Sequence, residues 1–300
     1  MTTHAKPALA VAKPATGFLC VASAALLWST GGLIVRELSA VDSWTIVFWR
    51  SLTAFAFLVV FGFARQGARF PRSMLRMGLP GLVIALCYTV ASIGLVVALK
   101  LTTVADVLII MSCAPLLAAV LGRIIIGERL QALGWLAMAA SMVGVGIMVS
   151  DSYAHGSLAG DLVALCIAGA IATATVIFRK FREVSLVPGV CLAAFIATLL
   201  VLPFARPWPL AGRELALLSV FGAGQLGLGL ALFATGAPLI PAAQAAMIGV
   251  LEPVVGPLWV WLVLGESPSP AGLLGGSIVI GALLLFTLAG LRGTAGSPAH

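Results

Sequence analysis

Residues 105–128 read ADVLIIMSCAPLLAAVLGRIIIGE, and residues 243–266 read AQAAMIGVLEPVVGPLWVWLVLGE. Each stretch is mainly apolar over about 20 residues, the length that an α-helix needs to cross the hydrocarbon core of a bilayer. The two stretches align without a gap when the first is shifted by 138 positions, from 105 to 243. The alignment pairs Ala105 with Ala243, Pro115 with Pro253, Gly127 with Gly265, and Glu128 with Glu266.

The composition of the whole chain agrees with a membrane protein. Apolar types make up 61% of the 300 residues and charged types only 9%, against roughly a quarter charged in soluble globular proteins. With this composition, a soluble protein would have too few polar residues to cover its surface, whereas lipid can cover the apolar side chains. The 33 glycines fit helices that pack closely within lipid.

Cysteine and basic residues exclude several other classes. The five cysteines are scattered through apolar stretches without CxxC spacing, so neither a disulfide framework nor a metal site is expected. No motif indicates a cofactor. The net charge of +7 comes from short basic runs between apolar stretches, which argues against nucleic-acid binding and for a topology signal.

Reading for apolar stretches of membrane-spanning length predicts an all-α protein with ten transmembrane helices. The expected spans are 16–36, 44–64, 77–99, 104–126, 132–150, 160–178, 188–205, 214–235, 240–264 and 271–290. Residues 1–15 and 291–300 are rich in proline, glycine and alanine and are expected to be flexible tails.

The positions of lysine and arginine predict the orientation of these spans. If the N-terminus lies inside, twelve basic residues fall on the inner side: Lys6, Lys13, Arg65, Arg69, Arg72, Arg76, Arg123, Arg129, Arg179, Lys180, Arg182 and Arg292. Four fall on the outer side: Arg36, Lys100, Arg206 and Arg213. The positive-inside rule therefore places both termini in the cytoplasm of a cell whose inner membrane holds the chain.

The chain also repeats itself. A shift of 143 positions lays Gly17 on Gly160, Thr30 on Thr173 and Arg36 on Arg179. Two repeats are expected, over residues 16–150 and 160–290, each with five spans. An odd number of spans turns the second repeat upside down relative to the first, as in secondary transporters that bind substrate between the two repeats.

Several motifs resemble the EamA repeats of the drug/metabolite transporter superfamily. ALKLTTVADVLIIMSCAPLL (98–117) and GERLQALGWLAMAASMVGVGIMV (127–149) resemble the first repeat, and AAMIGVLEPVVGPLWVWLVLGESPSPAGLLGG (245–276) resembles the second. Glu252-Pro253 matches the family's "EP", Trp28-Ser29 its "WG/S", and Arg50 its arginine in the second helix. One departure is Ser267, which follows the second "GE" where the pattern has arginine.

This resemblance covers about residues 18–290 and implies ten helices in two inverted repeats and export of small metabolites. Within the superfamily, the chain is most similar to inner-membrane amino-acid exporters of the aromatic-exporter (YddG) type. The substrate implied is a small amino acid, aromatic or otherwise apolar. The chain is then expected to be embedded in a lipid bilayer. Its expected oligomeric state is a monomer that carries both repeats.

Two charged residues within the spans are functional candidates. Glu252 lies in an apolar span, where a carboxylate costs at least about 2.5 kcal/mol by insertion scales. It is expected either to carry a proton or bind a substrate ammonium, or to have a structural or gating role beside Pro253. Arg50 is a candidate for binding a substrate carboxylate. The alternatives are that it pairs with Glu252, pairs with a helix C-terminus, or reaches outward to the interface.

Prolines and polar side chains within the spans predict a central cavity. Five prolines and four glycines are expected to interrupt helices along the substrate path: Pro115, Pro238, Pro241, Pro253 and Pro257, and glycines 222, 224, 227 and 229. The polar and aromatic residues expected to line the cavity are Trp28, Ser29, Thr30, Arg50, Tyr88, Ser92, Ser112, Gln225, Gln244 and Trp259. For each of them, a hydrogen bond between helices is the plain structural alternative.

Three other acidic residues have structural interpretations. Asp106 lies at the start of a span, where a carboxylate meets the positive end of the helix dipole. Glu128 and Glu266 follow their spans and are expected to be turn or cap residues.

Three classes of function compete. A transporter agrees with the repeats, whether its cargo is amino acids or other small organic solutes or drugs of the same superfamily. A membrane-embedded enzyme needs clustered carboxylates or a nucleophile with a base, but His4, His155 and His300 lie in tails or a loop and no span contains a DxxD pair. A channel needs a ring of charges or a filter loop, and the sequence contains neither.

Overall fold

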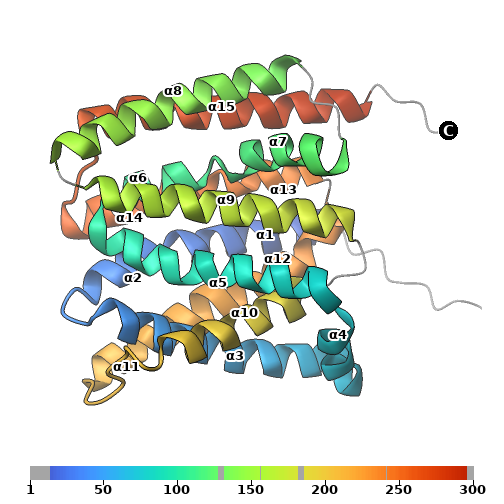
Figure 1. The fold of residues 1–300 in the computed structure, drawn as a ribbon, viewed down its shortest axis with the longest axis vertical. Helices are drawn as coiled ribbons and strands as arrows, with labels where there is room; N and C mark the ends of the chain where they lie inside the picture. Colours follow the sequence, from blue (N-terminus) through green and yellow to red (C-terminus); the bar gives the residue numbers. More distant parts are fainter. Residues whose placement is uncertain (1–13, 128–131, 156, 182–185, 241, 296–300) are drawn as a thin grey trace, which may run out of the picture.

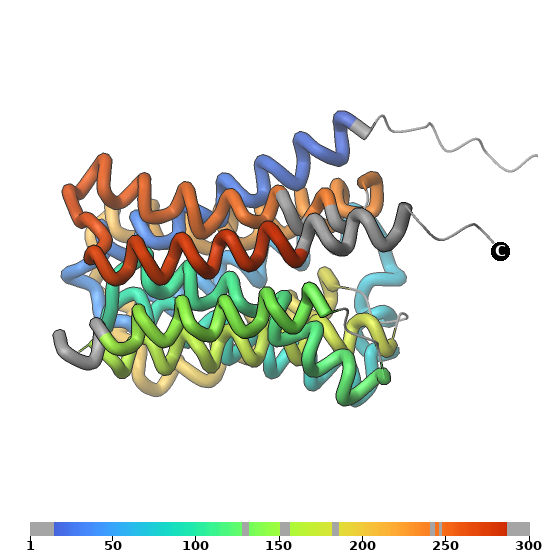
Figure 2. The backbone as a smooth tube through the Cα atoms, turned by 90° about the horizontal axis from the view of Figure 1, so that it is seen from above, coloured from blue at the N-terminus to red at the C-terminus, as the bar shows by residue number. Residues whose placement is uncertain are grey.

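The computed structural model describes residues 14–127, 132–155, 157–181, 186–240 and 242–295. Over these residues the chain is helical and contains no strand. The helices lie side by side along a common direction, as seen in Figures 1 and 2.

The first half of the chain contains the elements up to residue 155. These are α1 (Pro14–Ser29), α2 (Gly31–Glu37), α3 (Ser43–Gln66), η1 (Gly67–Arg69), α4 (Phe70–Arg76), α5 (Gly78–Leu101), α6 (Val104–Met111), α7 (Ala114–Ile126) and α8 (Ala132–His155). The N-termini of two of them are capped by side chains: Asp42 accepts a hydrogen bond from Thr45 N at 3.0 Å, and Thr103 accepts one from Asp106 N at 3.1 Å. These bonds satisfy backbone donors that the first turn of a helix leaves open.

The second half contains nine further elements. These are α9 (Leu158–Lys180), α10 (Leu186–Val201), α11 (Gly212–Ser219), the π-helix η2 (Val220–Leu228), α12 (Gly229–Gly236), η3 (Ala237–Leu239), α13 (Ala242–Gly249), α14 (Leu251–Leu264) and α15 (Pro270–Ala295).

The two "GE" turns are built alike where the structure describes them. α7 ends at Gly127 with φ 77°, and α14 ends at Gly265 with φ 71°. This left-handed conformation suits glycine and ends a helix by capping its last carbonyls.

Within the described residues, seven helical segments are long and apolar enough to cross a membrane. They are 15–37, 43–76, 78–101, 104–126, 132–150, 158–180 and 212–239, and three shorter apolar helices follow at 186–201, 251–264 and 270–286. The chain is therefore a multi-pass helical membrane protein.

The spans expected from the sequence differ from the helices in their continuity. Span 16–36 is divided at Thr30, span 104–126 at Ser112 and Cys113, and span 240–264 at Val250. The span predicted at 188–205 is shifted toward the C-terminus relative to the helix, because α10 begins at Leu186 and ends at Val201. Apolar windows do not detect such interruptions, because a broken helix keeps the hydropathy of a continuous one.

Reversal of the chain at each turn defines two ends of the bundle. At the Arg36 end, α2, α5 and α14 finish and α6 begins. At the Arg65 end, α3 and α9 finish and α10 and α13 begin. In Figure 1 the helices run between these ends, with α8 and α15 together along one edge and α3 and α10 toward the other.

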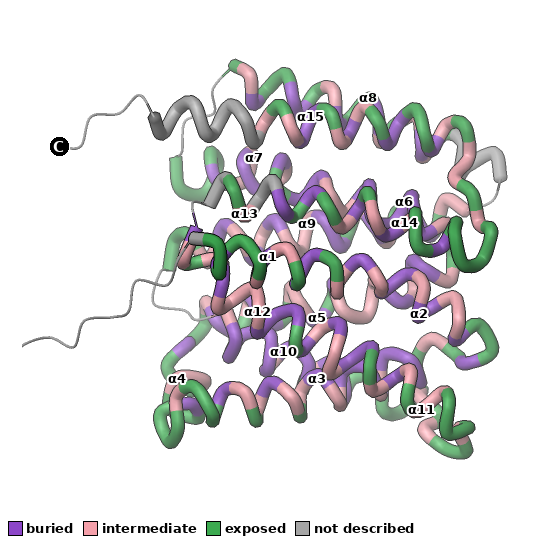
Figure 3. The backbone as a smooth tube through the Cα atoms, turned by 180° about the vertical axis from the view of Figure 1, so that it is seen from behind, coloured by how far each residue is buried: buried purple, intermediate pink, exposed green. Residues whose placement is uncertain are grey.

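Exposed apolar side chains lie on the outside of the bundle. Along α8 and α15, exposed positions recur between buried ones in Figure 3. The exposed residues there include Leu136, Met142, Val143, Leu273 and Leu274. Apolar side chains on an outer helix face fit contact with lipid tails, while the buried side of each helix faces its neighbours.

Close packing of η2 against α3 gives a testable consequence. A Cβ on Gly222 would collide with the side chain of Thr53 and the backbone carbonyl of Arg50. We expect Gly222→Ala to lower the melting temperature of the purified protein by several degrees, because a backbone atom cannot move aside and overpacking costs about 1–3 kcal/mol.

Gly224→Ala is the matched control in the same π-helix. A Cβ at Gly224 would lie 3.6 Å from Val220 Cγ1, which is ordinary van der Waals contact. Equal melting temperatures for the two variants, measured by thermal unfolding in detergent, would contradict this packing.

Candidate functional site

A cavity of about 740 Å³ lies inside the bundle and is lined by both halves of the chain. Its wall is mainly apolar. The lining residues are Trp28, Arg50, Tyr88, Ala91, Ser92, Leu95, Leu108, Met111, Ser112, Ala114, Pro115, Ile171, Thr175, Leu186, Val190, Ala193, Ala194, Gln225, Leu226, Leu230, Phe233, Ala237, Pro238, Ile240, Ala245, Gly249, Glu252, Pro253 and Leu283.

Arg50 supplies the positive charge of the cavity wall. It lies on α3, is only 3% exposed, and donates from Nη1 to Ser92 Oγ at 2.8 Å. Its guanidinium carbon lies 4.6 Å from the centroid of the Phe221 ring, a cation–π distance. Nε has no hydrogen-bond partner within the protein. Arg50 therefore does not extend to the membrane interface.

Glu252 supplies the negative charge of the same wall. It lies in the first turn of α14, directly after the break at Val250, where the positive end of the helix dipole stabilises a carboxylate. Although Arg50 also lines the cavity, no ion pair joins the two side chains. Neither charge is therefore neutralised by the other.

Two broken helices meet at the cavity. Pro115 follows the start of α7 and Pro253 follows the start of α14, and both line the wall. Proline has no backbone N–H to bond the carbonyl four residues earlier, and its ring clashes with that carbonyl, which accounts for a break just upstream. The start of one helix from each half therefore faces the same space.

Aromatic rings form part of the wall. Trp28 from α1 lies 5.4 Å, centroid to centroid, from Phe233 of α12, with the rings tilted by 40°. Tyr88 from α5 also lines the cavity. Phe233 was not among the predicted lining residues. A phenylalanine on a membrane helix can face a cavity or lipid, and the sequence does not distinguish the two.

Gln225 stabilises the break between α1 and α2. Its Nε2 donates to the Trp28 carbonyl at 3.0 Å, and its Oε1 has no partner within the protein. Because a division of α1 from α2 at Thr30 disturbs the backbone ladder near Trp28, an amide side chain from η2 can substitute for a helical donor. Gln225 is thus both a cavity residue and a structural one.

The predicted hydroxyl groups are largely engaged with their own helices. Ser112, on the wall, donates to the Ile109 carbonyl at 2.6 Å. Ser29 and Thr30 lie outside the lining and donate to carbonyls three residues earlier at 2.7 Å. Such bonds are the usual outcome for serine and threonine within membrane helices.

Gln244 and Trp259 also lie outside the cavity wall. Gln244 is exposed on α13, so its side chain points away from the cavity. The neighbouring Ala245 lines the cavity instead. Trp259 lies on α14 and donates from Nε1 to Ser29 Oγ at 3.1 Å. It joins the two halves of the chain outside the cavity.

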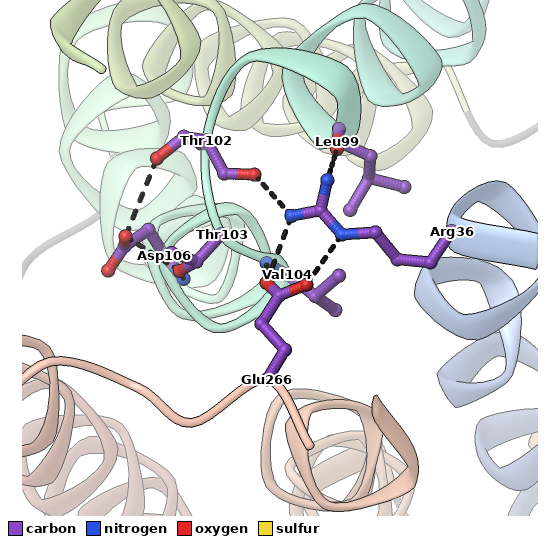
Figure 4. Close-up of polar contacts among 7 residues, drawn as sticks. All are labelled: Arg36, Leu99, Thr102, Thr103, Val104, Asp106 and Glu266. Carbon is purple, nitrogen blue, oxygen red and sulfur yellow. Dashed lines mark hydrogen bonds and ion pairs between the residues drawn. The ribbon is translucent and has the colours of Figure 1, made fainter. Parts of the chain in front are cut away.

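A second polar cluster lies at the Arg36 end and corrects the interpretation of Glu266. Glu266 was expected to be a turn or cap residue, but it forms an ion pair with Arg36, whose Nε lies 2.7 Å from Oε2 (Figure 4). Arg36 was predicted only to help orient the chain. The one sequence signal for this pair was an arginine and a glutamate at helix ends.

The cavity suits binding better than covalent chemistry. Its polar groups are one guanidinium, one carboxylate, and scattered amide and hydroxyl groups. Within the described part of the chain, no three histidine, cysteine, aspartate or glutamate side chains gather closely enough to hold a metal ion.

Comparisons with known proteins agree with this architecture. The model of the EamA-like transporter family matches residues 15–150 and again residues 158–288. A solved structure titled only as the crystal structure of a protein is similar in fold, with a TM-score of 0.66 and 23% identity over 93% of this chain and 100% of that one. No curated protein shows a significant sequence match.

The two family matches together span most of the chain and coincide with its two halves on either side of the connection between α8 and α9. Members of this family are small-molecule transporters of the drug/metabolite transporter superfamily. The chain belongs to the EamA-like transporter family.

Proposed function

We propose that this protein exports small metabolites, namely aromatic and other apolar amino acids, in the manner of the YddG-type exporters. The observation that carries the proposal is the charge pattern of the cavity: among the described lining residues, Arg50 and Glu252 are the ones with a formal charge. An α-amino acid carries one carboxylate and one ammonium, so each of its charges finds an opposite charge on the wall.

Each part of the substrate has a proposed partner. The planar guanidinium of Arg50 suits a carboxylate because it can donate two parallel hydrogen bonds. Glu252 suits the ammonium. Trp28, Tyr88 and Phe233 supply aromatic surface for an apolar side chain, in a site with few polar groups.

The size of the cavity also fits an alternative class of substrate. A volume of about 740 Å³ falls within the range of roughly 300–1,000 Å³ that is common for drug-sized ligands. A larger organic solute or drug with the same pair of charges is therefore the second candidate substrate.

The proposed architecture is ten spans in two inverted repeats, residues 16–150 and 160–290. The first repeat contributes the spans α1–α2, α3, α5, α6–α7 and α8, and the second contributes α9, α10, α11–η3, α13–α14 and α15. A twofold relation between repeats predicts that the most closely packed pairs of spans recur with the two repeats exchanged.

The packing of the helices supports this relation. α5 packs on α9, and the exchanged pair is α1 with α12. α3 packs on η2, and the exchanged pair is α10 with α5; α7 packs on α9, and the exchanged pair is α1 with α14. Pairs that exchange into themselves are also present: α3 with α10, α6 with α14, and α8 with α15.

Alternating access is the proposed mechanism, with the breaks before Pro115 and Pro253 as bending points and Glu252 coupling the movement to substrate or protons. The positive-inside rule places the Arg65 end in the cytoplasm, with both termini, in a cell inner membrane. Since one chain lines the whole cavity, a monomer is proposed as the working unit.

The experiment that tests the proposed function is uptake of labelled amino acids by purified protein in liposomes. Saturable uptake of phenylalanine, methionine or threonine supports it. Uptake of another metabolite without uptake of any amino acid would retain the transporter and remove the amino-acid substrate.

A further inference from the structure

The Arg36 end is held together by a cluster of contacts between the two halves (Figure 4). Arg36 Nη2 donates to Glu266 Oε1 at 2.9 Å, and Arg36 also donates to the carbonyls of Leu99 and Thr102 at 2.8 Å each. Val104 N donates to the same carboxylate at 3.4 Å. Glu266, which follows α14, is thereby attached to the ends of α2 and α5 and to the start of α6.

Glu266 is the member of this cluster that belongs to the second half. The first-half members are already joined to one another, because Lys100 on α5 donates to the carbonyls of Leu38, Ser39 and Val41 after α2 at 2.9–3.0 Å. Loss of the Glu266 contacts would therefore leave the first half assembled. It would remove the polar contacts at this end of α14, where the buried Val260 still packs in the apolar cluster that it shares with the first half.

Along its length, α14 packs against α1, α2 and α6 of the first half, and two of these contacts are especially close. Trp259 Nε1 donates to Ser29 Oγ at 3.1 Å. Gly256 lies so close to Leu108 that a Cβ there would collide with that side chain. The other end of α14 begins at the break after Val250, so α14 can swing about that point without unwinding a continuous helix.

Buried apolar side chains separate the cavity from the Arg36 end. Toward this end the cavity wall stops at Leu95 on α5 and Leu108 on α6. Beyond them, buried residues of one apolar cluster fill the space: Val35, Leu38, Val96, Leu99, Val104 and Val107. In the other direction the wall continues to the Arg65 end, where Leu186 begins α10 and Ile240 follows η3.

We infer that α14 is the gate that closes the cavity at the Arg36 end, and that the Arg36–Glu266 ion pair is its latch. The inference rests on the proposed alternating-access function and adds the residues that control which side is open. The structure is then the state that faces the cytoplasm. Opening outward requires Glu266 to leave Arg36 and α14 to move away from α2 and α6.

The test measures access to the cavity from each side. Leu95→Cys is introduced into a chain whose five native cysteines are replaced, and a membrane-impermeant maleimide is added to right-side-out or inside-out vesicles. We expect the parent to react from the cytoplasmic side and only slowly from outside. Adding Glu266→Gln is expected to raise the outside rate about tenfold, equivalent to about 1.4 kcal/mol in favour of the outward-open state.

Glu37→Gln is the matched control. Glu37 also pairs across the halves at the Arg36 end, with Arg213, but Arg213 is 70% exposed. Exposed ion pairs contribute little, so the outside rate is expected to change less than twofold. A second variant, Trp259→Phe, removes the donor to Ser29 while keeping an apolar ring, and is expected to raise the outside rate about threefold.

Two results would overturn the inference. One is rapid outside labelling of the parent, which means that the Arg36 end is already open. The other is an outside rate that neither Glu266→Gln nor Trp259→Phe increases while inside labelling stays normal. Labelling requires no substrate, so a failure of amino-acid uptake in the same vesicles would count against the proposed substrate and leave the gate intact.

Discussion

Replacing Arg50 with glutamine is expected to raise KM for amino-acid uptake by about 10- to 100-fold, with protein that still folds. The physical reason is the loss of charge-assisted hydrogen bonds to the substrate carboxylate, which contribute about 1.5–3 kcal/mol. Arg50 is well placed for this role because it is buried at the cavity and is held by Ser92 and the Phe221 ring. Uptake rates over a range of substrate concentrations give KM directly.

Arg65→Gln is the control for Arg50→Gln. Arg65 lies in the last turn of the same helix, α3, and is exposed, so its loss removes an equal charge away from the cavity. We expect KM to remain within twofold of the parent. An Arg50→Gln protein with an unchanged melting temperature and unchanged KM would exclude Arg50 as the carboxylate partner.

Replacing Glu252 with glutamine is expected to lower amino-acid uptake about tenfold at subsaturating substrate. The amide keeps the shape of the carboxylate but loses the charge that pairs with the substrate ammonium. If this pairing is the reason for the loss, competition by N-acetylated phenylalanine, which has no ammonium, is expected to be equal in parent and variant. Competition curves against labelled phenylalanine measure both quantities.

The corresponding control is Glu214→Gln. Glu214 accepts a hydrogen bond from Ala211 N at 3.0 Å and thereby caps α11 outside the cavity, so uptake is expected to stay near the parent value. If Glu252→Gln reduces uptake and competition by the N-acetylated compound to the same extent, Glu252 acts on the conformation of α14 and not on the ammonium.

Much of the fold follows from hydropathy and proline. The apolar stretches predict helices in the membrane, and Pro115 and Pro253 predict breaks, which the structure places just upstream of each proline. The break expected at Pro257 is wrong, because α14 continues through that residue, and Pro241 lies outside the described residues. Glycines 222, 224, 227 and 229 predicted an interruption, but the first three lie in the π-helix η2 and Gly229 begins α12, which follows without a break. The glycines allow close packing there: Gly222 and Gly227 lie against α3, and Gly229 lies against Trp28 of α1.

Contacts between distant segments account for the features that the sequence analysis missed. The break at Thr30 has no proline and depends on Gln225, a residue of another helix. Arg36 and Glu266 are 230 positions apart, and local patterns show only a helix-end arginine and a turn glutamate. Trp259 was predicted to line the cavity, but it lies outside the cavity wall. The prediction was wrong because helix periodicity does not show which face of a broken helix points into the cavity.

The most direct test of the central claim, that the cavity carries zwitterionic amino acids, is competition in the liposome uptake assay. Labelled phenylalanine is supplied together with unlabelled phenylalanine, methionine, N-acetylphenylalanine or phenethylamine, with and without a pH gradient. The account predicts saturable uptake that the two amino acids inhibit and that the analogues lacking one charge inhibit at least about tenfold less well. Equal inhibition by all four compounds, or no saturable uptake by correctly inserted protein, would contradict it.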